Sequence, residues 1–269
     1  MVFTTWFSND GSIKETTMFG FSILRGSTIT RESNTVEKML HSMFLKGASS
    51  GKQTSGLALA TYNEISVLKR NLASSAFTDI PEYTDLIRTR LHGDEIVTSI
   101  IGCHSNFGQL NEVDRSPLIR GGRVGSVSGK ISNADGLFNV FSKTFNRNGK
   151  VPEEIVFALL EQFNKKAENT AETITRAARS LVGKFLVAMI DSGDPHLLWL
   201  FRKEEPCTVV LFKKAGLLMW AVNKTHLTET TSFFEDIGPG EEVEFAPNTG
   251  LGINMHRHKI HRFKIDNEY

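Results

Sequence analysis

Hydrophobic positions in the first part of the chain follow two different periods. An apolar run over 18–24, interrupted only by small residues, predicts a buried strand. From Val36 to Phe44, apolar residues recur at spacings of three and four, which predicts an amphipathic helix with one face on a core. Two short apolar runs over 57–62 and 65–69, separated by two polar residues, predict a β-hairpin.

The rest of the chain predicts a strand, then helices, then more strands. A β-branched stretch over 95–101 predicts a strand, followed by a polar loop over 102–114. Pro152 suits the first turn of a helix, and the apolar residues after it continue on one helical face. Four later apolar runs, separated by turn-forming residues, predict strands at 185–190, 197–201, 208–212 and 217–222. This order, without strict alternation, favours an α+β layered sandwich over a doubly wound sheet.

Composition limits the classes of protein that the chain can represent. Its 269 residues, 40% hydrophobic and 23% charged, suit a large globular domain. A formal net charge of +1 gives no electrostatic case for a nucleic-acid or membrane partner of the whole chain. Two cysteines, Cys103 and Cys207, are too few for a disulfide framework or a zinc site, which favours a reducing compartment. No secretory signal is visible, and no apolar run reaches the roughly 20 residues that span a bilayer, so we expect a cytoplasmic protein.

Seven short segments, taken in order, resemble motifs of one protein family. They are Met18-Phe19-Gly20-Phe21, Gln53–Ala58, Ile101–Ser105, Val127–Asn133, Val182–Ile190, Trp220–Lys224 and Ile237–Val243. Together they resemble the class II glutamine amidotransferase domain, a member of the N-terminal nucleophile hydrolases, over residues 18–255. The resemblance implies a four-layer αββα sandwich of two antiparallel sheets with outer helices. It leaves an N-terminal arm at 1–17 and a basic C-terminal tail at 256–269.

The resemblance also implies which residues occupy the family's reactive positions. Family members use an N-terminal cysteine as nucleophile, but Phe19 stands at that position here. Ser128 replaces the oxyanion-hole asparagine, leaving only Gly129 of that pair, and Ser105 aligns near the arginine that would hold the substrate carboxylate. The acidic position before the next helix falls on Val151-Pro152. We therefore expect no catalytic residues, and we expect Phe19 at the mouth between the sheets, close to Ser105 and Ser128.

Two other nucleophiles and two other functions stay open. Self-cleavage before Thr16 or Thr17 would expose a terminal threonine, although such a pair is typical of a strand entry. Cys103 adjoins His104, but neighbours on a strand point to opposite faces, which favours a buried core cysteine. An active glutamine amidohydrolase or amidotransferase with a displaced nucleophile, and a small-molecule sensor using the former pocket, are therefore the alternatives to an inactive scaffold.

The residues from 256 to 264 have the most unusual local composition. His256, His258 and His261 alternate there with lysine and arginine. No strand or helix geometry makes three of these side chains converge, so we expect neither a metal nor any other cofactor. A basic tail is suited to contact an acidic protein surface or simply to be exposed. We expect a protein partner of unknown identity, bound through 1–17 and 256–269, and a small viral or phage-encoded protein located in the host cytoplasm or the virion.

Large aromatic residues mark the strands of the second half. Trp199, Phe201, Phe212 and Trp220 lie on neighbouring predicted strands. Because strands of this kind bury one face against a second layer, we expect all four side chains in the core between the two sheets.

Overall fold

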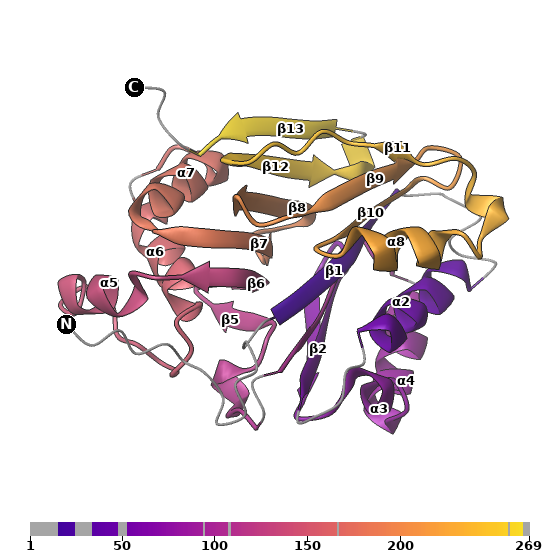
Figure 1. Ribbon diagram of the computed structural model, residues 1–269, viewed down its shortest axis with the longest axis horizontal. Coiled ribbons are helices and arrows are strands. Elements are labelled where there is room, and N and C mark those ends of the chain that lie inside the picture. Colours follow the sequence, from indigo (N-terminus) through magenta and orange to yellow (C-terminus); the bar gives the residue numbers. More distant parts are fainter. Residues whose placement is uncertain are drawn as a thin grey trace.

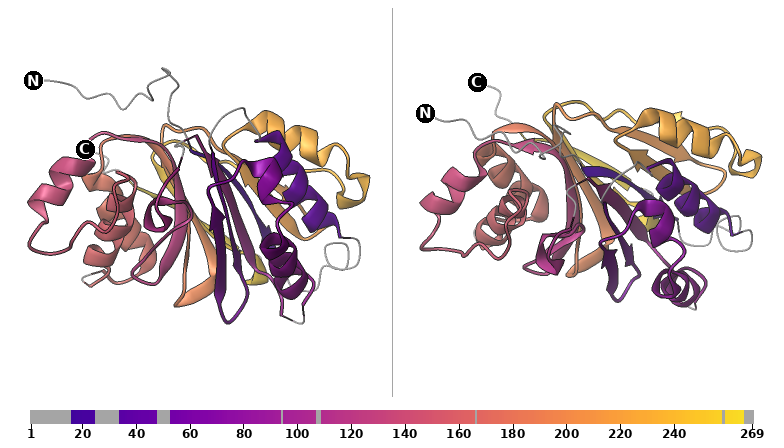
Figure 2. Two further views of the ribbon diagram at one scale, coloured as in Figure 1. Left: turned by 90° about the horizontal axis from the view of Figure 1, so that it is seen from below. Right: turned by 60° about the horizontal axis from the view of Figure 1, so that its bottom comes forward.

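The computed structural model describes residues 16–24, 34–47, 53–93, 95–106, 109–165, 167–257 and 259–265. Two antiparallel sheets lie face to face, and helices cover the outer side of each, so that the views in Figure 2 show four layers. This arrangement confirms the αββα sandwich expected from the resemblance. None of the described helices is long and apolar enough to cross a membrane. Of the predicted arm, only residues 16 and 17 are among the described residues.

The first sheet has seven strands in the order β11-β9-β10-β1-β4-β2-β3 (Figure 1). In chain order its strands are β1 (Thr16–Ile23), β2 (Thr54–Ala60), β3 (Ile65–Arg70), β4 (Ser99–Ser105), β9 (Thr208–Phe212), β10 (Leu217–Ala221) and β11 (Glu241–Glu242). Its outer face is covered by α2 (Thr35–Lys46), α3 (Ser74–Phe77), α4 (Pro81–Leu86), the π-helical turn Ile87–Leu91 and α8 (Lys224–Thr231). The predicted helix from Val36 and the predicted hairpin from 57 to 69 are therefore confirmed.

The second sheet has six strands in the order β13-β12-β8-β7-β6-β5. Its strands are β5 (Leu118–Arg120), β6 (Arg123–Ile131), β7 (Gly183–Asp191), β8 (Asp194–Lys203), β12 (Thr249–Asn254) and β13 (Lys259–Lys264). Its outer layer is α5 (Ala134–Val140), α6 (Glu154–Asn164) and α7 (Thr170–Ser180). Three 3₁₀ turns complete the fold at Glu112–Asp114, Glu235–Ile237 and Met255–Arg257.

Three apolar cores separate the four layers. Phe19 and Phe44 belong to the core between the first sheet and its helices, and Met18 and Trp220 belong to the core between the sheets. The third core joins the second sheet to α6 and includes Leu159. Adjacent residues on a strand point to opposite faces, so Met18 and Phe19 lie in different cores although they are neighbours in sequence.

Glycines in the strands make room for aromatic rings on the neighbouring strand. Four cross-strand pairs show this: Phe19 with Gly102, Trp220 with Gly20, Trp199 with Gly252 and Phe263 with Gly250. A Cβ atom added to Gly102 would lie 2.5 Å from the ring of Phe19, and one added to Gly20 would lie 2.6 Å from the ring of Trp220. These glycines therefore act as packing positions for the rings, which offsets their low strand propensity.

Several expectations about individual elements were wrong. The strand expected at 95–101 lies at Ser99–Ser105, so the polar-looking end with His104 is inside the sheet. Of the four aromatics expected between the sheets, only Trp220 lies there. Phe212 faces the helices of the first sheet, and Trp199 faces those of the second with Phe201. The error has one cause: a strand covered on both faces is apolar at every position, so its pattern does not tell which side faces which layer.

The structure also extends the domain beyond residue 255. The segment Lys259–Lys264, expected in a basic tail, is β13, which pairs with β12 along its whole length. Ile265, the residue after it, is fully buried. His258 and 266–269 lie outside the described residues. The expected boundary at 255 therefore falls inside the second sheet.

Candidate functional site

Phe19 faces the helices and does not lie at the mouth between the sheets. Its side chain is 2% exposed, and its ring meets that of Phe44 edge-on with centroids 5.1 Å apart. Gly102 on β4 and Ala221 on β10 flank it in the sheet. The expectation that Phe19 plugs a pocket between the sheets is wrong, because the alternation of β1 turns this side chain to the other face.

Two cross-strand rows on the opposite face of the first sheet form the candidate site. The rows run across β1, β4 and β2, and they are Thr16–Ser105–Thr54 and Met18–Cys103–Gly56. Met18 and Cys103 belong to the core between the sheets. Residues two apart on a strand point to the same face. Thr16, Ser105 and Thr54 are each two residues away from a member of the apolar row, so they share that face. The site is therefore a polar row next to an apolar row, at the end of the layer where β1 begins.

The hydroxyl groups of this polar row are already paired. The Oγ1 atom of Thr54 and the Oγ atom of Ser105 are 2.5 Å apart, and both side chains are buried. Ser105 therefore lies on the face between the sheets, as expected. Its side chain is a neutral hydroxyl and supplies no charge to this face.

The second sheet contributes Ser128 and Gly129 from β6. Both β1 and β4 contact β6, and Figure 1 shows the start of β1 close to the β5–β6 side of that sheet. Ser128 donates a hydrogen bond to the Glu205 carboxylate over 3.2 Å. Gly129 has a φ of +88°, and a Cβ atom there would lie 2.3 Å from the carbonyl oxygen of Lys184, so this position requires glycine. The structure thus places the elements that carry Ser105 and Ser128 against each other and excludes Phe19 from the face that they share.

Cys103 is enclosed and its thiol is hard to ionise. It is 1% exposed and donates a weak hydrogen bond to the carbonyl of Gly56 over 3.6 Å. Burial raises the pKa of the Cys103 thiol to about 12, and the nearby Ser126 and Lys69 oppose this rise only in part. Because the thiolate is the nucleophile in cysteine chemistry, this thiol is unreactive at neutral pH.

His104 does not form a dyad with Cys103. Its ring lies against Gly47 at the end of α2, on the helix side of the sheet: a Cβ atom added to Gly47 would lie 2.0 Å from the ring. Burial lowers the pKa of His104 to about 4, with a smaller contribution from the nearby His226. The two neighbours therefore point to different layers, as the alternation of a strand predicts.

The segment 109–117 covers the side of the candidate site. A Cβ atom at Gly56 would lie 2.1 Å from the carbonyl oxygen of Ser116 and 2.6 Å from Pro117, so this segment packs directly on the apolar row. Lys69 ends that row on β3 and donates to the carbonyl of Arg115 over 3.3 Å. Burial lowers the pKa of the Lys69 ammonium.

Hydrogen bonds of three further side chains fix the same segment. Arg115 donates to the carbonyls of Leu110 and Lys69 over 3.1 and 3.3 Å. Asn71 exchanges hydrogen bonds with the backbone of Leu110 in both directions. The Asp114 carboxylate accepts from the backbone amide of Val151 over 3.1 Å, which joins the segment to the start of α6. On this side, the segment is therefore held against the edge of the candidate site by its own hydrogen bonds.

The acidic residues at the start of α6, Glu153 and Glu154, have a structural role. Glu154 is buried, forms an ion pair with Arg120 and accepts from the backbone amides of Asn148 and Gly149. Burial raises the pKa of Glu153 to about 7, against the opposing effect of Arg147. Since α6 lies on the outer side of the second sheet, neither carboxylate reaches the candidate site.

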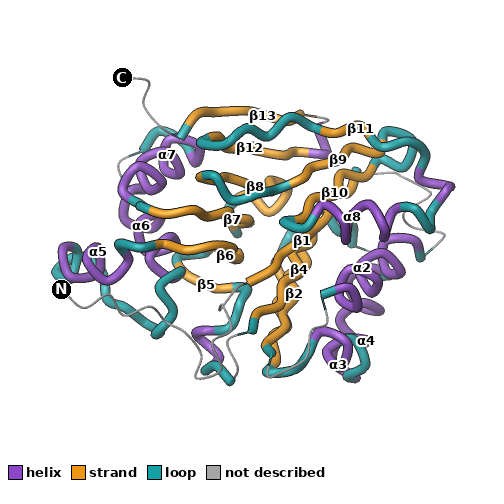
Figure 3. The backbone as a smooth tube through the Cα atoms, viewed as in Figure 1, coloured by secondary structure: helices purple, strands orange, loops and turns teal. Residues whose placement is uncertain are grey.

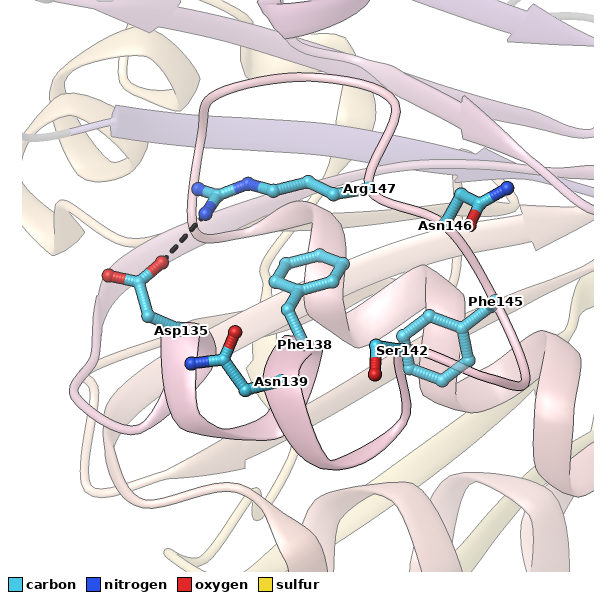
Figure 4. A pocket seen from close by; sticks show the side chains of 7 residues that line it. All are labelled: Asp135, Phe138, Asn139, Ser142, Phe145, Asn146 and Arg147. Atoms are coloured by element: carbon cyan, nitrogen blue, oxygen red, sulfur yellow. Dashed lines mark hydrogen bonds and ion pairs between the residues drawn. The ribbon is translucent and has the colours of Figure 1, made fainter.

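A surface hollow of about 480 Å³ lies next to α5 (Figure 4). It is lined by Asp135, Phe138, Asn139, Ser142, Phe145, Asn146 and Arg147. The Arg147 guanidinium pairs with Asp135 at 2.7 Å and lies over the Phe138 ring at 4.9 Å. Phe145 is flanked by Arg120, 5.5 Å from its ring centre. This hollow was not predicted from the sequence, although three phenylalanines within 138–145, followed by Arg147, were a usable signal.

Metal chemistry has no visible basis in the part of the chain that the structure describes. Those residues contain no group of three or more histidine, cysteine, aspartate or glutamate side chains close enough to hold an ion. His256 instead packs edge-on against Tyr62 with centroids 5.5 Å apart, and Tyr62 contacts His196 at 5.1 Å. These aromatic contacts tie the start of the C-terminal segment to the β2–β3 turn.

Comparison by sequence finds no relative of the chain. No family model matches it, and no curated protein does. Comparison of structures does find similar folds.

Two solved structures match almost the whole chain. One is the glutamine phosphoribosylpyrophosphate amidotransferase from B. subtilis complexed with ADP and GMP, with a TM-score of 0.64 and 14% identity over 94% of this chain. The other is described as the allosteric regulatory enzyme of purine biosynthesis, with a TM-score of 0.61 and 13% identity over 94% of this chain. The chain spans about half the length of each, 50% and 49%. At this identity the likeness concerns the fold, and the chain therefore has the fold of the class II glutamine amidotransferases, the N-terminal nucleophile hydrolase sandwich.

Proposed function

We propose that this chain is a catalytically inactive protein of the glutamine amidotransferase type, acting as a structural or protein-interaction module. One observation carries the proposal. On the face between the sheets where β1 begins, β1 itself presents the thioether of Met18 and the Thr16 hydroxyl, and the neighbouring β4 presents the enclosed thiol of Cys103, whose pKa burial raises to about 12. No ionised nucleophile is available there at neutral pH.

Two features of the surroundings support the same proposal. The Thr54 and Ser105 hydroxyls bind each other, and the segment 109–117 packs on Gly56. A substrate amide would need both a free donor set and space next to the attacking atom. A viral or phage-encoded accessory protein is the setting that we infer for such a scaffold.

The proposal is tested by intact mass and ammonia release on the purified full-length chain. We expect no processing within residues 1–20 and no glutamine-dependent ammonia release above that of a heat-denatured control. Release of ammonia by an unprocessed chain would contradict inactivity. The same sample should be incubated at pH 6, 7 and 8, since an active site with a shifted pKa shows activity in only part of this range.

A second function, an amidohydrolase with a displaced nucleophile, is favoured by the position of Thr16. This residue begins β1, is 6% exposed and lies opposite Ser105 on the face between the sheets. Thr17, the other candidate, shares the helix side with Phe19 by alternation. A cut before Thr16 would give that hydroxyl an adjacent α-amino group as base.

The two neighbouring threonines provide a matched pair of variants for this alternative. A mass that begins at Thr16, with ammonia release that Thr16→Ala abolishes and Thr17→Ala retains, would establish the displaced nucleophile and contradict our proposal. An unprocessed chain with no activity in either variant would exclude it.

A further inference from the structure

We propose that β13 is a docking edge for an extended acidic segment of a protein partner, which adds to the second sheet as a seventh strand. This inference rests on the interaction role proposed above and specifies its surface. Figure 3 shows β13 as the outermost strand of its sheet. The length of this edge, the direction of its hydrogen-bonding groups and its charge support the proposal.

Among the described strands, four form the edges of the two sheets, and β13 is the edge best suited to pairing. β11 has two residues and β5 has three, which is too short for a stable added strand. β3 has six residues, but the carbonyl of its Lys69 already accepts from Arg115. β13 also has six residues, Lys259–Lys264, and its inner side is fully paired with β12.

The contact made by Ile265, directly after β13, shows which residues of the strand form hydrogen bonds with β12. Ile265 donates to the carbonyl of Asn248, its direct partner in the continued β12–β13 register, over 3.0 Å. Hydrogen-bonded pairs alternate along an antiparallel ladder, so Lys259, His261 and Phe263 bond to β12. The backbone groups of Ile260, Arg262 and Lys264 therefore point outward.

One contact confirms that the backbone of Lys264 points outward, and it also marks the end of the edge available to an added strand. The carbonyl of Lys264 accepts from the hydroxyl of Thr175 on α7 over 3.3 Å. That carbonyl is already used, whereas the outward N–H and C=O groups of Ile260 and Arg262 have directions suited to a new strand. An added strand would pair mainly with these two residues.

The charge of the edge selects the partner. Residues 255–265 contain lysine, arginine and histidine and no aspartate or glutamate. Lys259, His261, Arg262 and Lys264 are exposed. A second copy of β13 would place like charges opposite each other, which is destabilising. An acidic strand would instead gain favourable cross-strand pairs, and the same basic residues would keep other strands away.

The side chains of β13 define a sequence pattern for its partner. Ile260 packs towards the core between the sheets and Phe263 towards the core under α7, and both are only partly buried. Directly opposite residues form the pairs that stabilise a sheet. Apolar residues opposite these two and acidic residues opposite the four basic positions give the pattern Glu-Val-Glu-Glu-Val-Glu. The pattern is a palindrome, so it suits both strand directions.

The proposal is tested with a labelled ten-residue peptide containing Glu-Val-Glu-Glu-Val-Glu, titrated with the full-length protein and followed by fluorescence anisotropy. We expect saturable binding that weakens with added salt, and at least tenfold weaker binding of a peptide with lysine in place of every glutamate. The same acidic peptide with N-methylated backbone amides keeps its charge but cannot pair as a strand, and it should also bind at least tenfold more weakly.

A substitution in the protein also separates strand pairing from attraction by charge. Ile260→Pro removes an outward N–H group without changing charge, and proline is tolerated at such edge positions. We expect at least tenfold weaker peptide binding for this variant and unchanged binding for Ile260→Val. Equal binding of the normal and N-methylated peptides would overturn strand addition, and so would the absence of binding. Ammonia release from glutamine would contradict the proposed inactivity while leaving this result unaffected.

Discussion

The two faces of β1 pack against different layers and carry different kinds of side chain, although they alternate residue by residue. The helix face carries Phe19, Phe21 and Ile23, which join an apolar core rich in aromatic rings. The face between the sheets carries Thr16, Met18, Gly20 and Ser22, and the Ser22 hydroxyl has a polar partner: its Oγ lies 3.1 Å from Ser99 Oγ. One face is therefore an aromatic packing surface, and the other carries the polar row of the candidate site.

This difference shows that the surroundings of each side chain of β1 depend on the face to which it points. A shift of one residue moves a side chain from one face of a strand to the other. The motif resemblance places the family's nucleophile at Phe19, whereas the face between the sheets is reached from Met18 and Thr16. The four predictions that follow test this contrast between the faces.

The largest effect is expected on the helix face. Phe19→Ala removes a ring that is 2% exposed and packs on Phe44. We expect a loss of about 3–5 kcal/mol in the free energy of unfolding, measured by urea denaturation. A loss below about 1 kcal/mol would mean that the ring is not packed as described.

Gly102 provides the control for this variant. A Cβ atom there meets the Phe19 ring at 2.5 Å, so Gly102→Ala alone should destabilise the protein by about 1–3 kcal/mol. In Phe19→Ala/Gly102→Ala the added methyl group enters the space that the ring has left. The double variant should therefore be more stable than the sum of the single effects predicts.

The second effect, also on the helix face, depends on pH. Burial lowers the pKa of His104 to about 4 from its usual 6.5, so between these values the unfolded chain binds more protons than the folded one. Stability therefore falls as the pH is lowered from 6.5 to 4, by up to about 3 kcal/mol from this group. Denaturation at several pH values should show the decline, and His104→Gln should flatten it.

Glu153 contributes the opposite slope and must be separated from His104. Its pKa is raised to about 7, so between its ordinary value and 7 the folded chain binds more protons, and stability falls as the pH rises. We expect Glu153→Gln to steepen the dependence that His104 causes. Identical pH profiles for the normal protein and His104→Gln would contradict the buried position of the imidazole.

The sequence predicted elements wherever one face of an element is apolar and the other polar. The helix from Thr35 to Lys46 shows the expected spacing because its apolar residues face one core. β4 was placed four residues too early because Gly102 and His104 look like loop residues. Both are accommodated by neighbours in the folded sheet: the ring of Phe19 covers Gly102, and Gly47 leaves space for His104.

The candidate site was only partly predictable because its strands are buried on both faces. β1 is buried on both faces, so its sequence does not indicate which parity faces the second sheet. Ser105 and Ser128 could be assigned to facing elements because each lies in one of the seven motifs. The face to which Phe19 points could not be predicted, because it depends on how the two sheets stack. β13 was missed because an edge strand needs few apolar residues, and its basic side chains resemble a tail.

The third prediction concerns the polar row between the sheets. Thr54→Val or Ser105→Ala alone leaves one buried hydroxyl without its partner at 2.5 Å, which should cost about 1–3 kcal/mol. The double variant removes both hydroxyls and should cost less than the sum of the two. Strict additivity in urea denaturation would indicate that the two hydroxyls do not depend on each other.

The fourth and smallest effect tests whether the family's chemistry can be restored at position 19. A chain shortened to begin at this position and carrying Phe19→Cys would have the terminal thiol and α-amino group that the family uses. Because the side chain at this position points to the helices and away from Ser105 and Ser128, we expect no ammonia release from glutamine above that of the same shortened chain carrying Phe19→Ser. Folding of both shortened chains is checked first by circular dichroism. Activity of the Phe19→Cys chain alone would show that the terminal residue turns to the face between the sheets, and the contrast drawn between the two faces would then not hold at the start of β1.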